Sequence, residues 1–172
     1  MKKLTLVLLA VSFTSAFISC KKDKETTSDS ATVTVNASLL GFDGTSGTAF
    51  KSTAGKVTKS GNSYTLTAVE DGAKRSISIT VNNVTALGTF TLDKGNTSTN
   101  MGILVKDNTS TDATLTYKTD GVSTTGGIGG GSLQITKLTD TEIEGKFYVV
   151  AYNSAKVAAF VENGAFSGKI TK

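Results

Sequence analysis

From Thr32 almost to the end of the chain, apolar and polar residues alternate with a period of two. The first run places Val33, Val35, Ala37 and Leu39 on one face, with threonine, asparagine and serine between them. Successive side chains of a β-strand point to opposite faces, so this pattern predicts strands with one buried face. No other feature of the sequence constrains the fold as strongly.

Two segments give the clearest strand pairs. Residues 63–82 alternate on both sides of Asp71-Gly72, a dipeptide that tolerates positive φ, and this predicts a β-hairpin. Residues 133–152 alternate around a turn at Thr139-Asp140, and a further turn is expected at Asn163-Gly164 before the closing strand.

The whole pattern predicts an all-β, antiparallel domain of about nine to eleven strands in meander order, without a substantial helix. Regular spacing and hairpin turns suit either a β-sandwich or a barrel of calycin type. We expect three parts: a signal peptide over 1–19, a lipidated cysteine with a flexible tether over 20–31, and a single β-domain over 32–172.

The tether and signal are expected from the first 31 residues. Met-Lys-Lys precedes an uncharged apolar run from Leu4 to Ile18, too short to span a bilayer comfortably and typical of a secretory signal. Ser19 and then Cys20 resemble the lipobox of bacterial lipoproteins, although Phe17 stands where that motif prefers leucine. The resemblance implies lipidation of Cys20 and anchoring in the cell envelope, at the outer membrane, with the periplasmic or surface side left open.

The composition excludes several classes of function. Without residues 1–19 the chain has 16 cations and 14 acids, since two of its 18 cations are lost, so its net charge is only +2. Because no basic patch with interleaved aromatics occurs, we expect no nucleic-acid partner. The chain has no histidine, and its single cysteine is assigned to lipid. We therefore expect no metal, no cofactor and no catalytic triad.

Two short segments are weak candidates for function. Asp29-Ser30-Ala31 fits the pattern of O-glycosylation in Bacteroidota and makes Ser30 a candidate acceptor. The glycine-rich segment 121–132 lacks the Gly-Lys-Ser/Thr and the following helix of a phosphate-binding loop. We therefore interpret it as a hairpin connection.

The segment from Gly131 to Gly168 carries a Gly-x-hydrophobic-x-Ile-Thr-Lys segment, a Gly-x-Phe strand, and Asn-Gly-x-Phe at 163–166. With these motifs it resembles a family of small Bacteroidota lipoproteins of unknown function. The start of the chain matches less closely, at Val35-Asn36-Ala37. The resemblance implies an envelope location and a β-domain, and it implies no catalytic residue.

Candidate sites lie mainly on the outer face of the strand expected over 142–152. Glu142 and Glu144 form a carboxylate pair with about 7 Å between their Cβ atoms, and Asp107 and Asp112 are weak candidates for calcium ligands. The second half of that face is apolar, so we expect another sheet to cover it. The alternative is a contact surface for a sugar or a protein, formed by Tyr148, Val150 and Tyr152.

These observations favour a non-catalytic, lipid-anchored envelope protein that serves as a binding or scaffold module for an unknown protein or glycan ligand. One alternative is a glycan hydrolase that uses Glu142 and Glu144 alone. Another is an inhibitor of a lysozyme-type enzyme, with segment 121–132 as its protruding loop.

Overall fold

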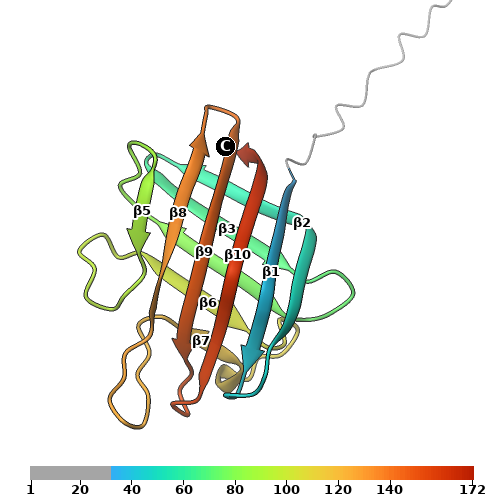
Figure 1. The fold of residues 1–172 in the computed structure, drawn as a ribbon, viewed down its shortest axis with the longest axis vertical. Coiled ribbons are helices and arrows are strands. Elements are labelled where there is room, and N and C mark those ends of the chain that lie inside the picture. The colour runs from blue at the N-terminus through green and yellow to red at the C-terminus, as the bar shows by residue number, and fades with distance from the viewer. Residues whose placement is uncertain (1–31) are drawn as a thin grey trace, which may run out of the picture.

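The computed structural model describes residues 32–172, which form one ten-stranded sheet folded into two layers (Figure 1). The strands and one short 3₁₀ turn are β1 (Val33–Phe42), β2 (Thr48–Ser60), β3 (Ser63–Val69), β4 (Ser76–Val81), β5 (Gly88–Thr91), β6 (Met101–Val105), η1 (Ala113–Leu115), β7 (Thr116–Lys118), β8 (Gly130–Leu138), β9 (Glu142–Tyr152) and β10 (Ala158–Thr171). The predicted all-β, antiparallel class is confirmed. The signal peptide, Cys20, the tether and Ser30 lie outside the described residues.

One layer contains β5, β8, β9, β10 and β1, and the other contains β3, β4, β6 and β7, which cross behind it in Figure 1. β2 belongs to both layers, because its first half pairs with β1 and its second half with β3. A single pair, Lys118 with Tyr152, joins β7 to β9 on the opposite side. The fold thus has the two layers of a sandwich and the continuous pairing of a barrel.

The strand order departs from a pure meander at two places. β5 leaves the sequence-adjacent β4 and β6, which pair with each other, and it pairs with β8 at the edge of the first layer. β7 pairs with β9 and not with β8, the next strand along the chain. β10, the last strand, also pairs with β1, the first, although most of the domain separates them in the sequence. The two ends of the domain therefore lie side by side. The alternation of side chains along each strand does not indicate which distant strands pair.

The space between the layers is filled by apolar side chains. Val57, Leu66 and Ile79 of one layer face Leu133 and Phe166 of the other, around a cavity of about 10 Å³. A cavity needs about 10–15 Å³ to hold one water. A small-molecule ligand of the kind a calycin barrel encloses therefore has no room at this point.

Two Gly-x-Phe segments, one in β9 and one in β10, pair with each other in opposite directions. Gly164 pairs with Phe147, and Phe166 pairs with Gly145. A Cβ added to Gly164 would lie 2.4 Å from the Phe147 ring, and one added to Gly145 would lie 2.5 Å from the Phe166 ring. Each phenylalanine ring thus packs over the glycine of the other strand, which accounts for both motifs.

The turn expected at Asn163-Gly164 is wrong. β10 continues through this point, and the pairing with β9 shifts register between Val161 and Gly164. Asn163 has a φ of 49°, a left-handed conformation that asparagine tolerates better than most residues. The Asn163-Gly164 dipeptide therefore forms a β-bulge and not a turn, because the neighbouring β9 and β1 continue on both sides of β10.

Candidate functional site

In the first half of β9, the carboxylates on the outer face form ion pairs. Lys137 of β8 lies 2.9 Å from a carboxylate oxygen of Glu142 and 3.2 Å from one of Glu144. The hydrogen bond from Lys137 lowers the pKa of Glu142. A glycosidase acid needs a raised pKa and a pocket, whereas these half-exposed carboxylates are paired and the pKa of Glu142 is shifted the other way. The geometry gives the hydrolase interpretation no support.

In the second half of β9, the side chains on the same face are not paired in this way and are exposed to solvent. The side chain of Tyr148 is 53% exposed and that of Val150 is 38% exposed, so the expectation that a second sheet covers them is wrong. Within the described part of the chain, neither Lys146 nor the hydroxyl of Tyr148 or Tyr152 has a hydrogen-bond or ion-pair partner. We refer to Tyr148, Val150 and Tyr152 as the contact row. Its role in binding stays a prediction.

The contact row borders three hollows in the surface, each open to solvent. The bulge hollow, of about 380 Å³, lies between β8, β9 and β10 and is bordered by Lys146 and Tyr148. The glycine hollow, of about 450 Å³, is bordered by Tyr148 and Val150. The distal cleft, of about 630 Å³, is bordered by Tyr152. The row thus connects three depressions along one strand.

The glycine hollow is lined by three consecutive glycines, Gly129, Gly130 and Gly131. Asp93 stands at one side and accepts a hydrogen bond from the Gly131 amide at 3.1 Å. A Cβ added to Gly130 would lie 2.3 Å from an oxygen of Asp93. The glycines therefore allow the loop before β6 to approach β8 closely. Ile128, 58% exposed, adds an apolar border.

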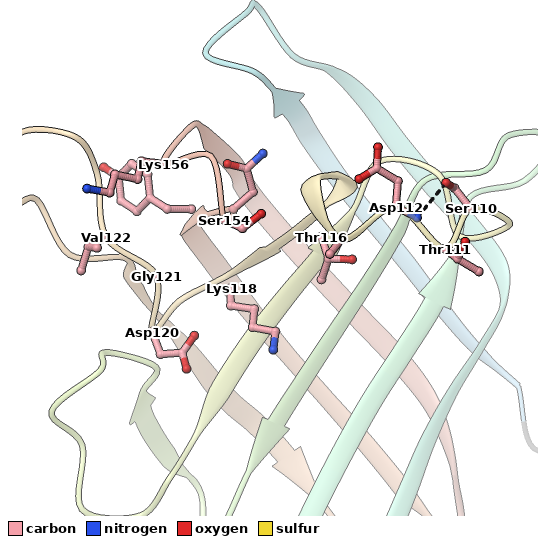
Figure 2. A pocket seen from close by; sticks show the side chains of 13 residues that line it. Ser110, Thr111, Asp112, Thr116, Lys118, Asp120, Gly121, Val122, Ser154 and Lys156 are labelled. Atoms are coloured by element: carbon pink, nitrogen blue, oxygen red, sulfur yellow. Dashed lines mark hydrogen bonds between the residues drawn. The ribbon is translucent and has the colours of Figure 1, made fainter.

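Figure 2 shows the distal cleft, at the end of the molecule where β9 ends. Thr116 and Lys118 of β7 lie between the loop that carries Asp112 and the turn that carries Lys156. The cleft contains two lysines, two aspartates and several hydroxyls: Ser110, Thr111, Asp112, Thr116, Lys118, Asp120, Ser154 and Lys156. This mixture of charges favours no single ligand charge.

The candidate calcium ligands serve as local caps. Asp107 accepts hydrogen bonds from the amide and hydroxyl of Thr109, and Asp112 does the same for Thr114. These bonds lower the pKa of both carboxyls. Over residues 32–172 there is no group of three or more His, Cys, Asp or Glu side chains placed to hold a metal ion.

The glycine-rich segment 121–132 forms a narrow connection that ends in β8. Val122 and Ile128 form an isolated antiparallel bridge, and the Gly129 amide donates to the Gly121 carbonyl at 2.9 Å. In Figure 1 the connection projects below β8. The segment links β7 to β8, which do not pair with each other because β9 lies between them, so the expected hairpin is limited to the Val122–Ile128 bridge.

Two polar clusters that the sequence did not indicate lie near the C-terminal end of β1. Asp43 accepts hydrogen bonds from Lys106 and from the Tyr117 hydroxyl, and these lower its pKa. Burial, with the bond to Asp43, raises the pKa of Tyr117. Arg75 pairs with Glu70 and donates to two carbonyls and one hydroxyl around the β1–β2 turn. Both clusters tie this turn to the second layer and are structural.

The contact row itself was visible in the sequence, because three apolar residues at strand spacing stand on one face. The polar groups of the hollows around it, such as Gln134, Asn163 and Asp93, were not. They come from β8, β10 and the loop after β5. The pairing of β9 with β8 and β10, and of β8 with β5, brings them beside the row.

Comparison with known proteins places the β-domain in a family without assigned function. No curated protein and no solved structure matches the chain. In the described residues, no helix has the length and apolar character to cross a membrane. The expected kinship with Bacteroidota lipoproteins stays a prediction. A family model described as a domain of unknown function (DUF6252) matches residues 42–168, from the end of β1 to near the end of β10, and the chain belongs to that family.

Proposed function

We propose that this protein is a non-catalytic binding module of the cell envelope, held to a membrane by lipid on Cys20. Its ligand contacts the contact row and the hollows beside it. The observation that carries this proposal is the contrast within β9. In the first half of β9, Glu142 and Glu144 on the outer face form ion pairs with Lys137. In the second half, the outer face exposes Tyr148 and Val150 to solvent.

The chemistry of the chain supports a role in binding without catalysis. The sequence has no histidine, the commonest general base near neutral pH. The carboxylates first considered for catalysis or metal binding are held by Lys137 or cap their own loops. Exposed tyrosines, in contrast, are favoured at interfaces because the ring has an apolar face and a polar tip.

The direction of β1 supports the proposed anchoring. β1 begins at the end of the molecule where β10 ends, and the distal cleft lies at the opposite end (Figure 1). A tether that enters β1 from Cys20 would therefore present the cleft away from the membrane. Two or more acyl chains give a stable anchor, whereas a single chain gives only marginal binding.

Cell fractionation of Cys20→Ser tests the anchor. Acylation supplies about 0.8 kcal/mol per buried methylene, and a lysine near an anionic surface supplies about 1 kcal/mol that salt screens. We therefore expect the variant to be soluble at physiological salt, with an unchanged circular dichroism spectrum. If it sediments with membranes as the wild type does, Cys20 is not the anchor.

Photo-crosslinking in cells tests the binding surface. A benzophenone amino acid replaces Tyr148 in one variant and Val69 in the control, since Val69 is an exposed apolar residue at the end of β3, away from the hollows. We expect adducts, to protein or glycan, from position 148 alone. Equal labelling from both positions, or none from position 148, would contradict the proposed surface.

A second candidate, inhibition of a lysozyme-type enzyme, is favoured by the projecting connection 121–132 and by the 58% exposure of Ile128 within it. The full chain is added to a lysozyme assay beside an Ile128→Ser variant. Inhibition by the wild type and its loss in the variant would assign this role. Unchanged lysozyme activity in both samples would exclude it for the enzyme used.

A further inference from the structure

We infer that the bulge hollow binds a sugar unit that carries a carboxylate, with the ring of Tyr148 against the sugar and Lys146 against the carboxylate. This inference rests on the proposed binding function and specifies its ligand class. It concerns one of the three hollows, and it makes the contact row part of a glycan-binding surface.

The hollow lies beside the bulge in β10. Ala165 of β10 pairs with Lys146, so a small residue stands beside this outer side chain of β9, while Gly164 pairs with the inward-facing Phe147. On the other side Ser132 of β8 pairs with Tyr148. The depression between these strands has a volume of about 380 Å³. That is within the range of small-ligand sites, about 300–1,000 Å³.

The charge of the hollow favours an anionic group. Lys146 is the one charged residue among those that line it, and no carboxylate lines it. Lys146 has no partner in the described part of the chain, unlike Lys137 on the same surface, which pairs with two glutamates. A carboxylate on the ligand would supply the missing counter-charge, and charge-assisted hydrogen bonds are the stronger ones.

The remaining groups favour a sugar as the carrier of that charge. Gln134 pairs across the sheet with Lys146, and its amide has no partner within residues 32–172. Asn163 uses its side-chain NH₂ group on Ser38 at 3.0 Å, which leaves its carbonyl oxygen as an acceptor. Amides and a serine hydroxyl match the hydroxyls of a sugar. The half-exposed ring of Tyr148 offers an apolar surface to the C–H face of a pyranose.

Titration calorimetry with the full chain in detergent tests the inference. The probes are oligogalacturonide, its carboxyl-reduced counterpart, sialyllactose and polyglutamate. Lys146→Gln removes the charge, Tyr148→Ser removes the ring, and Tyr148→Phe retains it. Lys56→Gln is the matched control, because Lys56 is an exposed lysine of β2 that does not line the hollow.

We expect saturable binding of oligogalacturonide or sialyllactose, and which of them binds identifies the acid. Lys146→Gln should weaken binding about tenfold or more, the effect of one charged hydrogen bond. Tyr148→Ser should weaken it about tenfold, while Tyr148→Phe and Lys56→Gln change it less than about threefold. Carboxyl reduction should weaken binding as much as Lys146→Gln does.

Other outcomes overturn the inference in distinguishable ways. If the reduced sugar binds as well as the acid, or polyglutamate binds as tightly, recognition is not of an acidic sugar. If neither acidic sugar binds but position 148 crosslinks to a protein, the ligand class is wrong and the binding function stands. If neither sugar binds and position 148 captures nothing, both proposals fail.

Discussion

Gly164→Ala should destabilise the β-domain, because its added methyl would collide with the ring of Phe147. The new Cβ would lie 2.4 Å from ring carbon Cε2, whereas ordinary contacts lie at 3.4–4 Å, so the ring must move by about 1 Å. Phe147 is only 3% exposed, and the Phe166 ring lies 6.3 Å from its ring centre. Overpacking of this kind costs about 1–3 kcal/mol. We expect about 2 kcal/mol, a large fraction of the 5–15 kcal/mol typical of a domain.

Urea unfolding followed by circular dichroism measures this loss. Gly88→Ala is the control, since a Cβ at Gly88 of β5 meets no atom within 4 Å. It should be neutral or slightly stabilising. A double-mutant cycle with Phe147→Ala adds a sharper test, because the methyl at position 164 then occupies part of the space that the ring leaves.

The cycle should show a coupling of about 1 kcal/mol or more, with the double variant less destabilised than the sum of the single variants. Two results would refute the packing argument. One is a stability of Gly164→Ala within about 0.5 kcal/mol of the Gly88→Ala control. The other is strict additivity in the cycle.

Three further predictions concern polar contacts. Arg75→Ala should cost about 3 kcal/mol in urea unfolding, because it leaves a largely buried Glu70 charge and two carbonyls unpaired; a loss below about 0.5 kcal/mol would contradict this. Tyr117→Phe should cost about 1–2 kcal/mol at pH 7. Burial raises the pKa of Tyr117, so wild-type stability should fall as pH rises above about 10. Phenylalanine removes this contribution, and an equally steep alkaline loss in the variant would argue against it. Glu142→Gln should leave the midpoint of urea unfolding unchanged, since its pair with Lys137 is exposed; a clear shift of the midpoint would show that the pair stabilises the domain.

The alternation of side chains determined the fold class and most strands. The hairpin over 63–82, the turn at Thr139-Asp140 and the long strand that became β9 follow directly from it. Each of these elements is stabilised by burial of one face, and a period of two specifies which residues face inward. The contact row was also visible, as three residues at strand spacing.

Only the tertiary structure decided what lies on the outer side of those strands. A pattern of apolar residues at Tyr148 and Val150 is the same whether a second layer covers them or solvent does. The deciding fact is that the second layer packs on the opposite face of β9. The Asn163-Gly164 dipeptide likewise fits a turn or a bulge, and its pairing partners select the bulge. Long-range pairing thus created the hollows, because it placed small residues of β10 and glycines of the β7–β8 connection beside the exposed tyrosine of β9.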